Sequence, residues 1–321
     1  MQVTRTTREV AFEWSVIVYY LAQLSVLSIG MLFYLFLERR LSRWSQLFLW
    51  AALLPSQVLT ELSAGFVFPV IRLTVFLIMI YMAVRRAFPW RQALVVLALL
   101  IPSMAFKTEY RKLVWSEGRT ELPRSLSELV GNGVSFGATV FSAIRETGPE
   151  GVYYGAQTVV QRLDLLYAFG YVMELTPRDV PYLNGATYSA LFWKPLPRVF
   201  FPNKPREEWG NEFGQRYGFL DPDDNTTSVN MPQMLEMYVN FGIIGVVVGM
   251  WLLSQLYRAL NSVLNNRDAG EWGTVLAALI LSSLINVESN FLLVFGGLLQ
   301  LGVLLYIIGL LVGQRGASAI A

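Results

Sequence analysis

Residues 181–245 read PYLNGATYSALFWKPLPRVFFPNKPREEWGNEFGQRYGFLDPDDNTTSVNMPQMLEMYVNFGIIG. This polar stretch is rich in proline, glycine, arginine and lysine, and it runs directly into an apolar segment long enough to cross a membrane. Anion-binding side chains and turn residues are therefore expected at the boundary between water and lipid. An enzyme acting on a lipid-linked phosphate would need them at that boundary.

The composition of the whole chain indicates an integral membrane protein. Of its 321 residues 54% are hydrophobic and only 15% are charged, whereas about a quarter are charged in a soluble domain. There is no cysteine and no histidine, which excludes disulfides, thiolate catalysis and the usual general base near neutral pH. We expect no metal site and no cofactor, so any chemistry must depend on carboxylates, cations, hydroxyls and amides.

Seven apolar stretches predict an all-α polytopic membrane protein with about seven transmembrane helices. The N-terminal segment 1–106 holds four of them, 107–233 forms one large extracytoplasmic loop with amphipathic helices, and 234–321 holds the last three. Pro102 predicts a kinked or irregular end for the fourth span. The predicted spans are Trp14–Leu37, Gln46–Leu62, Phe66–Val84, Trp90–Phe106, Met234–Tyr257, Gly273–Val287 and Phe291–Val312.

Arginines in the short loops set the predicted orientation. If the spans alternate, the loops after the first, third and fifth spans and the C-terminal tail share one side, and the positive-inside rule makes that side the cytoplasm. The loop 107–233 then lies outside, where Val152 to Gly170 has the pattern of an amphipathic helix. It lies on the membrane surface or packs against the transmembrane helices. The short-loop arginines are Arg39, Arg40, Arg43, Arg85, Arg86, Arg91, Arg258, Arg267 and Arg315.

Four ionisable residues fall inside apolar spans or directly at a span's end, each near the predicted outer end. They are Glu61, Arg72, Glu236 and Glu288. Charged groups are costly there and usually serve function, so they predict a site facing the outer loop, with Arg72 among its substrate-binding residues. Glu236 also shares a helix face with Asn240. The alternative is that these residues are interfacial caps and interhelical hydrogen bonds.

Four prolines between Pro195 and Pro205 fix the backbone around Arg198, Lys204 and Arg206. Guanidinium groups bind phosphate bidentately and lysine adds a point charge, so this loop is expected to hold a pyrophosphate. The alternative is a structural turn whose cations pair with neighbouring glutamates or with lipid head groups.

Three elements in this half of the chain resemble the C-terminal half of bacterial O-antigen polymerases, also called oligosaccharide repeat-unit polymerases. They are PYLNGAT at 181–187, PLPRVFFPNKP at 195–205 and EMYVNFGIIGVVVGM at 236–250, in the same order and spacing. The family usually has more upstream helices than the four predicted here.

This resemblance implies a metal-independent, GT-C-like membrane glycosyltransferase in the bacterial plasma membrane. Such an enzyme polymerises undecaprenyl-pyrophosphate-linked oligosaccharide repeat units into O-antigen or exopolysaccharide, with membrane lipids and a chain-length regulator as further partners and no nucleic acid. Arg198, Lys204 and Arg206 would bind the leaving group. The residues Glu236, Tyr238 and Asn240 would orient the acceptor, and Arg162 and Asp164 match an Arg-plus-polar pair of the loop helix. The candidate bases are Asp164, Glu236 and Glu288.

Other functions remain open at this stage. An O-antigen ligase has a similar layout but is thought to use a loop histidine, which this chain lacks. A transporter or flippase for the same lipid-linked sugar would place charges and broken helices near the bilayer midplane, whereas the charges here are predicted at the outer face. A non-catalytic assembly partner has no positive sign in the sequence.

Overall fold

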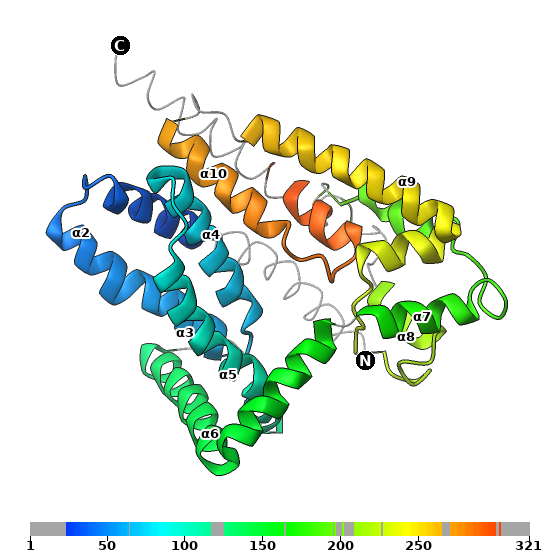
Figure 1. Cartoon of the computed structure of the whole chain (residues 1–321), viewed down its shortest axis with the longest axis horizontal. Helices are drawn as coiled ribbons and strands as arrows, with labels where there is room; N and C mark the ends of the chain where they lie inside the picture. Colours follow the sequence, from blue (N-terminus) through cyan, green and yellow to red (C-terminus); the bar gives the residue numbers. More distant parts are fainter. Residues whose placement is uncertain are drawn as a thin grey trace. The chain divides into compact units, whose positions relative to one another are not determined.

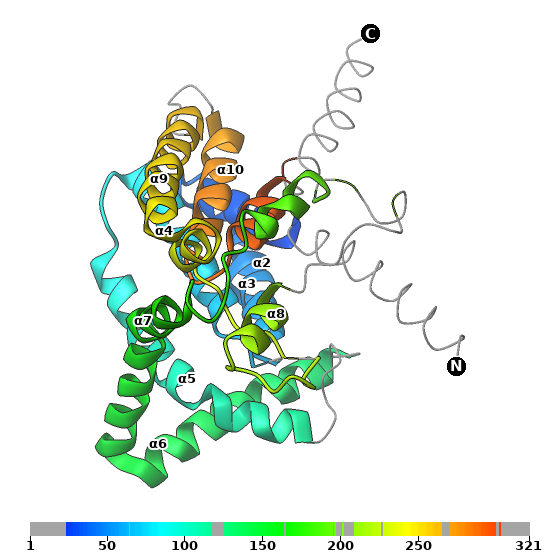
Figure 2. The same cartoon turned by 90° about the vertical axis from the view of Figure 1, so that its right-hand side faces the viewer.

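The computed structural model describes residues 24–63, 65–116, 125–163, 165–194, 209–225, 227–264 and 270–299, with residues 196, 201 and 302. These residues form helices, turns and irregular segments, and none of them forms a strand. Figures 1 and 2 show the helices, of which Leu24–Leu37 and 291–299 carry no label. The labelled elements are α2 (Arg43–Phe48), the π-helix η1 (Leu49–Leu53), α3 (Leu54–Ser63), α4 (Phe68–Arg85), α5 (Trp90–Ser116), α6 (Leu126–Leu163), α7 (Leu165–Leu175), the 3₁₀ helix η2 (Ala186–Phe192), α8 (Trp209–Arg216), α9 (Gln233–Leu264) and α10 (Gly270–Ser283).

The chain forms two compact units that cut across the three predicted segments. Unit 1 contains Leu165–Ser262 and the residues from Ser283 onward, and unit 2 contains Gln23–Asp164 and Val263–Ser282. The first part of the predicted outer loop therefore belongs with the N-terminal helices, as does α10. The all-helical class is confirmed, while the sidedness of the three segments stays a prediction.

Unit 2 is built around α6, which packs against α5 and α3. The core between them is apolar. Tyr110 links α5 to the end of α3, because its hydroxyl donates to the Ser63 carbonyl at 3.1 Å. At Gly148, with φ +61°, α6 turns sharply and forms the two arms seen in Figure 1. The buried side chains of this core are Val67, Phe106, Tyr110, Phe136 and Val140.

Unit 1 has its own core, formed by α7, α8 and the first part of α9. Its buried members are aliphatic and aromatic side chains from three separate stretches of the chain, and their contacts hold these short helices against one another. They are Val172, Phe213, Tyr217, Met231, Leu235, Tyr238 and Val239.

Among the described residues, α4 and α9 are long and apolar enough to cross a membrane. The apolar helices Leu24–Leu37 and Trp90–Met104 are shorter, so the seven-span topology stays a prediction. The fourth predicted span differs from the structure at its end. There α5 continues as a helix through Pro102 to Ser116, because proline removes one backbone donor and packing of α5 against α6 compensates for its loss.

A close helix contact in unit 2 gives a stability prediction. A Cβ at Gly30 would lie 2.3 Å from the ring of Phe76, which is itself buried on α4. We expect Gly30→Ala to destabilise unit 2 by about 1–3 kcal/mol through overpacking, seen as a lower midpoint of thermal unfolding in detergent. The matched control is Gly137→Ala on α6, where a Cβ meets nothing within 4 Å; a lowered midpoint in both variants would contradict the packing argument.

Candidate functional site

The apolar helix α9 is interrupted near its start by Gly242. This residue has φ +66° and ψ −158°, a conformation that glycine adopts readily and other residues do not. A Cβ there would also lie 2.8 Å from the hydroxyl oxygen of Tyr182. The segment 233–241 is thus a short helix of its own, and the segment after the break continues as the long apolar helix.

The break frees backbone carbonyls, and the YLNGAT turn supplies donors for them. Leu183 N donates to Val239 O at 2.9 Å, and Asn184 N donates to Asn240 O at 3.2 Å. An unpaired buried carbonyl costs free energy comparable to a lost hydrogen bond. Two of the three sequence elements quoted above, far apart in the chain, therefore form one hydrogen-bonded structure.

The side chain of Asn240 is the centre of this structure. Its Oδ1 accepts from Gly185 N at 2.8 Å, and its Nδ2 donates to Thr187 Oγ1 at 2.9 Å and to Glu236 O at 2.8 Å. Both Asn240 and Thr187 are fully buried. One amide thus ties η2 to the short helix and uses both of its donor protons.

Glu236 lies one turn before Asn240, with no exposed surface. Its Oε2 accepts from Phe291 N at 2.6 Å, at the start of the helix 291–299, where a negative charge is favourable. Asn290 caps the same helix, because its Oδ1 accepts from Leu293 N at 2.8 Å. The interfacial-cap interpretation of Glu236 therefore has direct support for one carboxylate oxygen.

The other oxygen of Glu236 is different. Oε1 is buried and accepts no hydrogen bond of good geometry from the described residues. Gln233 Nε2, a donor, and the Tyr257 hydroxyl are also buried without a partner of good geometry in the described part of the chain. The Thr187 hydroxyl lies beside the carboxylate, and the Gln233 amide lies beside Tyr257. Unpaired buried polar groups are rare and call for a specific cause, such as a catalytic role or a bound molecule.

Near Glu236, aromatic rings contact one another in a series from Phe241 to Tyr257. Tyr188 stacks on Phe241 with centroids 6.3 Å apart and meets Phe291 edge-on at 5.9 Å. Phe291 stacks on Phe295 at 4.3 Å, and Phe295 on Tyr257 at 6.0 Å. Burial, and then the nearby Glu236 carboxylate, raise the pKa of the Tyr188 phenol, so this residue is a neutral donor near pH 7 and not a base.

Tyr238, which the resemblance assigns to the acceptor, points elsewhere. Its hydroxyl donates to Thr176 O at 3.0 Å, and its ring belongs to the core of unit 1. Thr176 Oγ1 in turn lies 2.7 Å from the Tyr217 hydroxyl. The structure brings Glu236 and Asn240 together and separates Tyr238 from them, because residues two apart on a helix face different sides.

Arg72 and Glu61 meet in unit 2. Both line a pocket between α3 and α4, with Gln57 and Ser282 as its other polar residues. Gln57 Nε2 donates to Glu61 Oε1 at 3.1 Å, and Ser25 Oγ donates to Gln57 Oε1 at 2.6 Å. Two residues predicted as one set from their costly positions thus share a pocket, whereas Glu236 and Glu288 belong to unit 1.

The remaining predicted residues are less completely described. Asp164, Arg198, Lys204 and Arg206 lie outside the described residues, as does the side chain of Arg162 in the last turn of α6. Glu288 is half-buried in the turn before Asn290. In the described part of the chain, no group of three acidic residues could hold a metal ion.

Thr187, Gln233 and Tyr257 were not predicted as site residues. Thr187 lies inside the quoted YLNGAT element, and Gln233 precedes Glu236 by one helical turn, so both carried a positional signal. Tyr257 lies beyond the break in α9 and carried no such signal.

Comparison of the chain with protein-family models, with curated proteins and with solved structures gave no match.

The Asn240 amide gives a testable stability effect. We expect Asn240→Ala to lower the stability of unit 1 by about 2–4 kcal/mol, because Gly185 N–H and Thr187 lose a buried partner. The measurement is the midpoint of thermal unfolding in detergent. Ser189→Ala is the control on the same 3₁₀ helix, since Ser189 is exposed and bonds only within its own turn; equal losses in the two variants would contradict a central role for Asn240.

Proposed function

We propose that this protein is a membrane glycosyltransferase that polymerises undecaprenyl-pyrophosphate-linked oligosaccharide repeat units. The observation that carries the proposal is the junction of the YLNGAT turn with the E-x-Y-x-N-F-G helix around a buried carboxylate. These two elements carry the resemblance to O-antigen polymerases, and their direct contact supports a shared site. A GT-C-like arrangement and a bacterial plasma-membrane location are part of the same proposal.

Exposed apolar surface supports the membrane setting. After the break at Gly242, α9 presents Ile243, Ile244, Val247 and Trp251 with more than half of their side-chain surface exposed, and α5 does the same with Leu94, Val95, Leu97 and Leu99. Large contiguous apolar patches on a protein surface mark contact with lipid or another protein. The segment 243–264 is long enough, at ~1.5 Å per residue, to cross ~30 Å of hydrocarbon.

The proposed glycosyl transfer needs a proton acceptor and a counter-charge for the leaving group. In the transfer, an acceptor hydroxyl oxygen forms a bond to the anomeric carbon as the bond from that carbon to the pyrophosphate oxygen breaks. The hydroxyl proton needs an acceptor, and Glu236 Oε1 is a carboxylate oxygen without a partner among the described residues. The leaving pyrophosphate gains negative charge, which Arg198, Lys204 and Arg206 would stabilise.

The position of this carboxylate also implies movement. Glu236 has no exposed surface, so in the proposed mechanism an acceptor sugar reaches Oε1 only after the residues that cover it shift.

A transporter for the same lipid is the alternative from another class. Its signature would be a helix broken near the middle of the membrane. The break at Gly242 lies near the start of α9, which favours chemistry at the membrane surface. A ligase, which transfers the glycan to lipid A core, uses the same leaving group. It differs from the proposed polymerase in the acceptor that receives the glycan.

Two substitutions at Glu236 distinguish a role as proton acceptor from a structural role as the cap of the helix 291–299. Glu236→Gln keeps an oxygen to accept from Phe291 N but cannot take a proton, so we expect polymer synthesis to fall about 100-fold or more with little change in unfolding temperature. Glu236→Ala loses both functions and should also unfold at lower temperature. The measurement is the ladder of glycan chain lengths on a gel, from cells that make the polymer; long chains at normal abundance in Glu236→Gln would leave Glu236 as a structural cap only.

Substitutions in the proline-rich loop test the leaving-group role. Arg198→Ala or Arg206→Ala should leave the protein in the membrane, and the ladder should shrink to one repeat unit on the acceptor, because the departing pyrophosphate loses its counter-charge. Arg178→Ala is the control, since Arg178 is exposed and pairs with Asp179 at 2.7 Å. Failure to deliver even a single unit would indicate a transporter, and an unchanged ladder would contradict the role of the loop.

A further inference from the structure

One end of unit 2 gathers arginines from two loops that are far apart in the sequence. The loop after the helix Leu24–Leu37 and the end of α4 are joined by Arg85, whose Nη2 donates to Leu37 O at 2.5 Å. The short turn after α4 leads at once into α5. The resulting surface, named the arginine end, contains the exposed residues Arg39, Arg40, Arg43, Arg85, Arg86 and Arg91.

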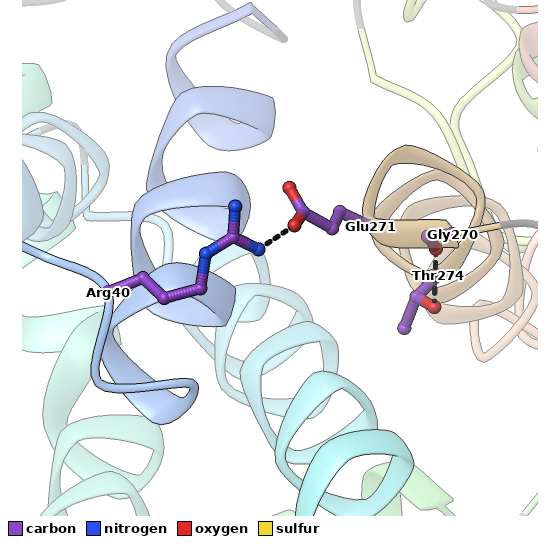
Figure 3. Close-up of polar contacts among 4 residues, drawn as sticks. All are labelled: Arg40, Gly270, Glu271 and Thr274. Atoms are coloured by element: carbon purple, nitrogen blue, oxygen red, sulfur yellow. Dashed lines mark hydrogen bonds and ion pairs between the residues drawn. The ribbon is translucent and has the colours of Figure 1, made fainter.

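Two of the six arginines are used to build this surface. Arg85 holds the two loops together, and Arg40 pairs with Glu271 in the first turn of α10. Figure 3 shows the Arg40 guanidinium and the Glu271 carboxylate pointing toward each other, beside the bond from the Thr274 hydroxyl to Gly270 O. Arg40 therefore has a fixed place in the structure.

The other four arginines are free to bind a ligand. Arg39, Arg43, Arg86 and Arg91 form no ion pair with any residue in the described part of the chain. The described acidic residues of these loops and of the α10 start are Glu38 and Glu271. Positive charge is thus in clear excess, and guanidinium groups suit phosphate oxygens.

Exposed aromatic and aliphatic side chains adjoin these arginines. Trp44 is 82% exposed and Trp90 is 69% exposed, and Phe88 contacts Trp90 with ring centroids 4.5 Å apart. The exposed apolar side chains of α5 begin one turn after Trp90. Tryptophan beside arginine and next to apolar surface is typical of the lipid head-group level of a membrane. A nucleic acid would leave the apolar part uncovered.

We infer that the arginine end is a binding surface for the anionic head groups of membrane phospholipids. Arg39, Arg43, Arg86 and Arg91 bind the phosphates, while Arg85 joins the two loops and Arg40 pairs with Glu271. This surface depends on the proposed membrane setting and not on glycosyl transfer. Its loss therefore leaves the question of catalysis at Glu236 untouched.

The test measures lipid binding to the full chain in a neutral detergent. Phosphatidylglycerol and phosphatidylcholine are added separately at low and high salt, and bound lipid is counted by native mass spectrometry. We expect the wild type to prefer phosphatidylglycerol by about tenfold or more and to lose the preference at high salt, because exposed charges are screened. Equal binding of the two lipids by the wild type would overturn the inference.

Variants locate the effect. The fourfold variant R39Q, R43Q, R86Q, R91Q should reduce the phosphatidylglycerol preference about tenfold, and R145Q with R178Q, two exposed arginines outside this surface, should keep it. Glu271→Gln should keep the preference, because Arg40 is not one of the four phosphate-binding arginines and Arg85 still joins the two loops. An unchanged preference in the fourfold variant would overturn the assignment.

Discussion

A broken helix needs partners for the backbone groups that the break exposes, and unit 1 is organised by that requirement. At Gly242 the helix α9 stops and restarts, and the carbonyls of Val239 and Asn240 are left without helical donors. The YLNGAT turn supplies both. Because a buried unpaired carbonyl is costly, displacement of this turn would lower the stability of unit 1.

The same junction explains why polar groups are concentrated there. Asn240 uses its whole amide to join the turn to the helix, and Glu236 joins the helix to the start of 291–299. Three chain segments thus meet at two side chains. Glu236 Oε1 and Gln233 Nε2, on the same short helix, are buried without a hydrogen-bond partner of good geometry in the described part of the chain. In our proposal, these hydrogen bonds hold the groups of the reaction centre in place.

In our proposals, unit 1 carries the glycosyl transfer and unit 2 carries the lipid-binding surface. Unit 1 carries the junction around Glu236, and unit 2 carries the arginine end and the pocket that Glu61 and Arg72 share. These charged residues therefore have three distinct structural settings: buried with a backbone hydrogen bond, lining a shared pocket, and exposed in excess at a loop end. The cost of a charge differs among these settings, so a single explanation from sequence position does not serve all of them.

Sequence alone determined the helical class, the apolar stretches α4 and α9, and the pairing of Glu236 with Asn240 on one face, because helical period and hydrophobicity are local properties. The YLNGAT element, which contains Thr187, was also recognisable in the sequence. Only the tertiary structure decided that the turn caps α9, that Tyr238 faces the core and that Tyr257 lies beside the Gln233 amide. Those outcomes depend on a φ angle at Gly242 and on contacts between residues more than fifty positions apart, for example Asn240 with Gly185. No local pattern encodes such contacts, since they follow from how separate segments satisfy one another's backbone groups.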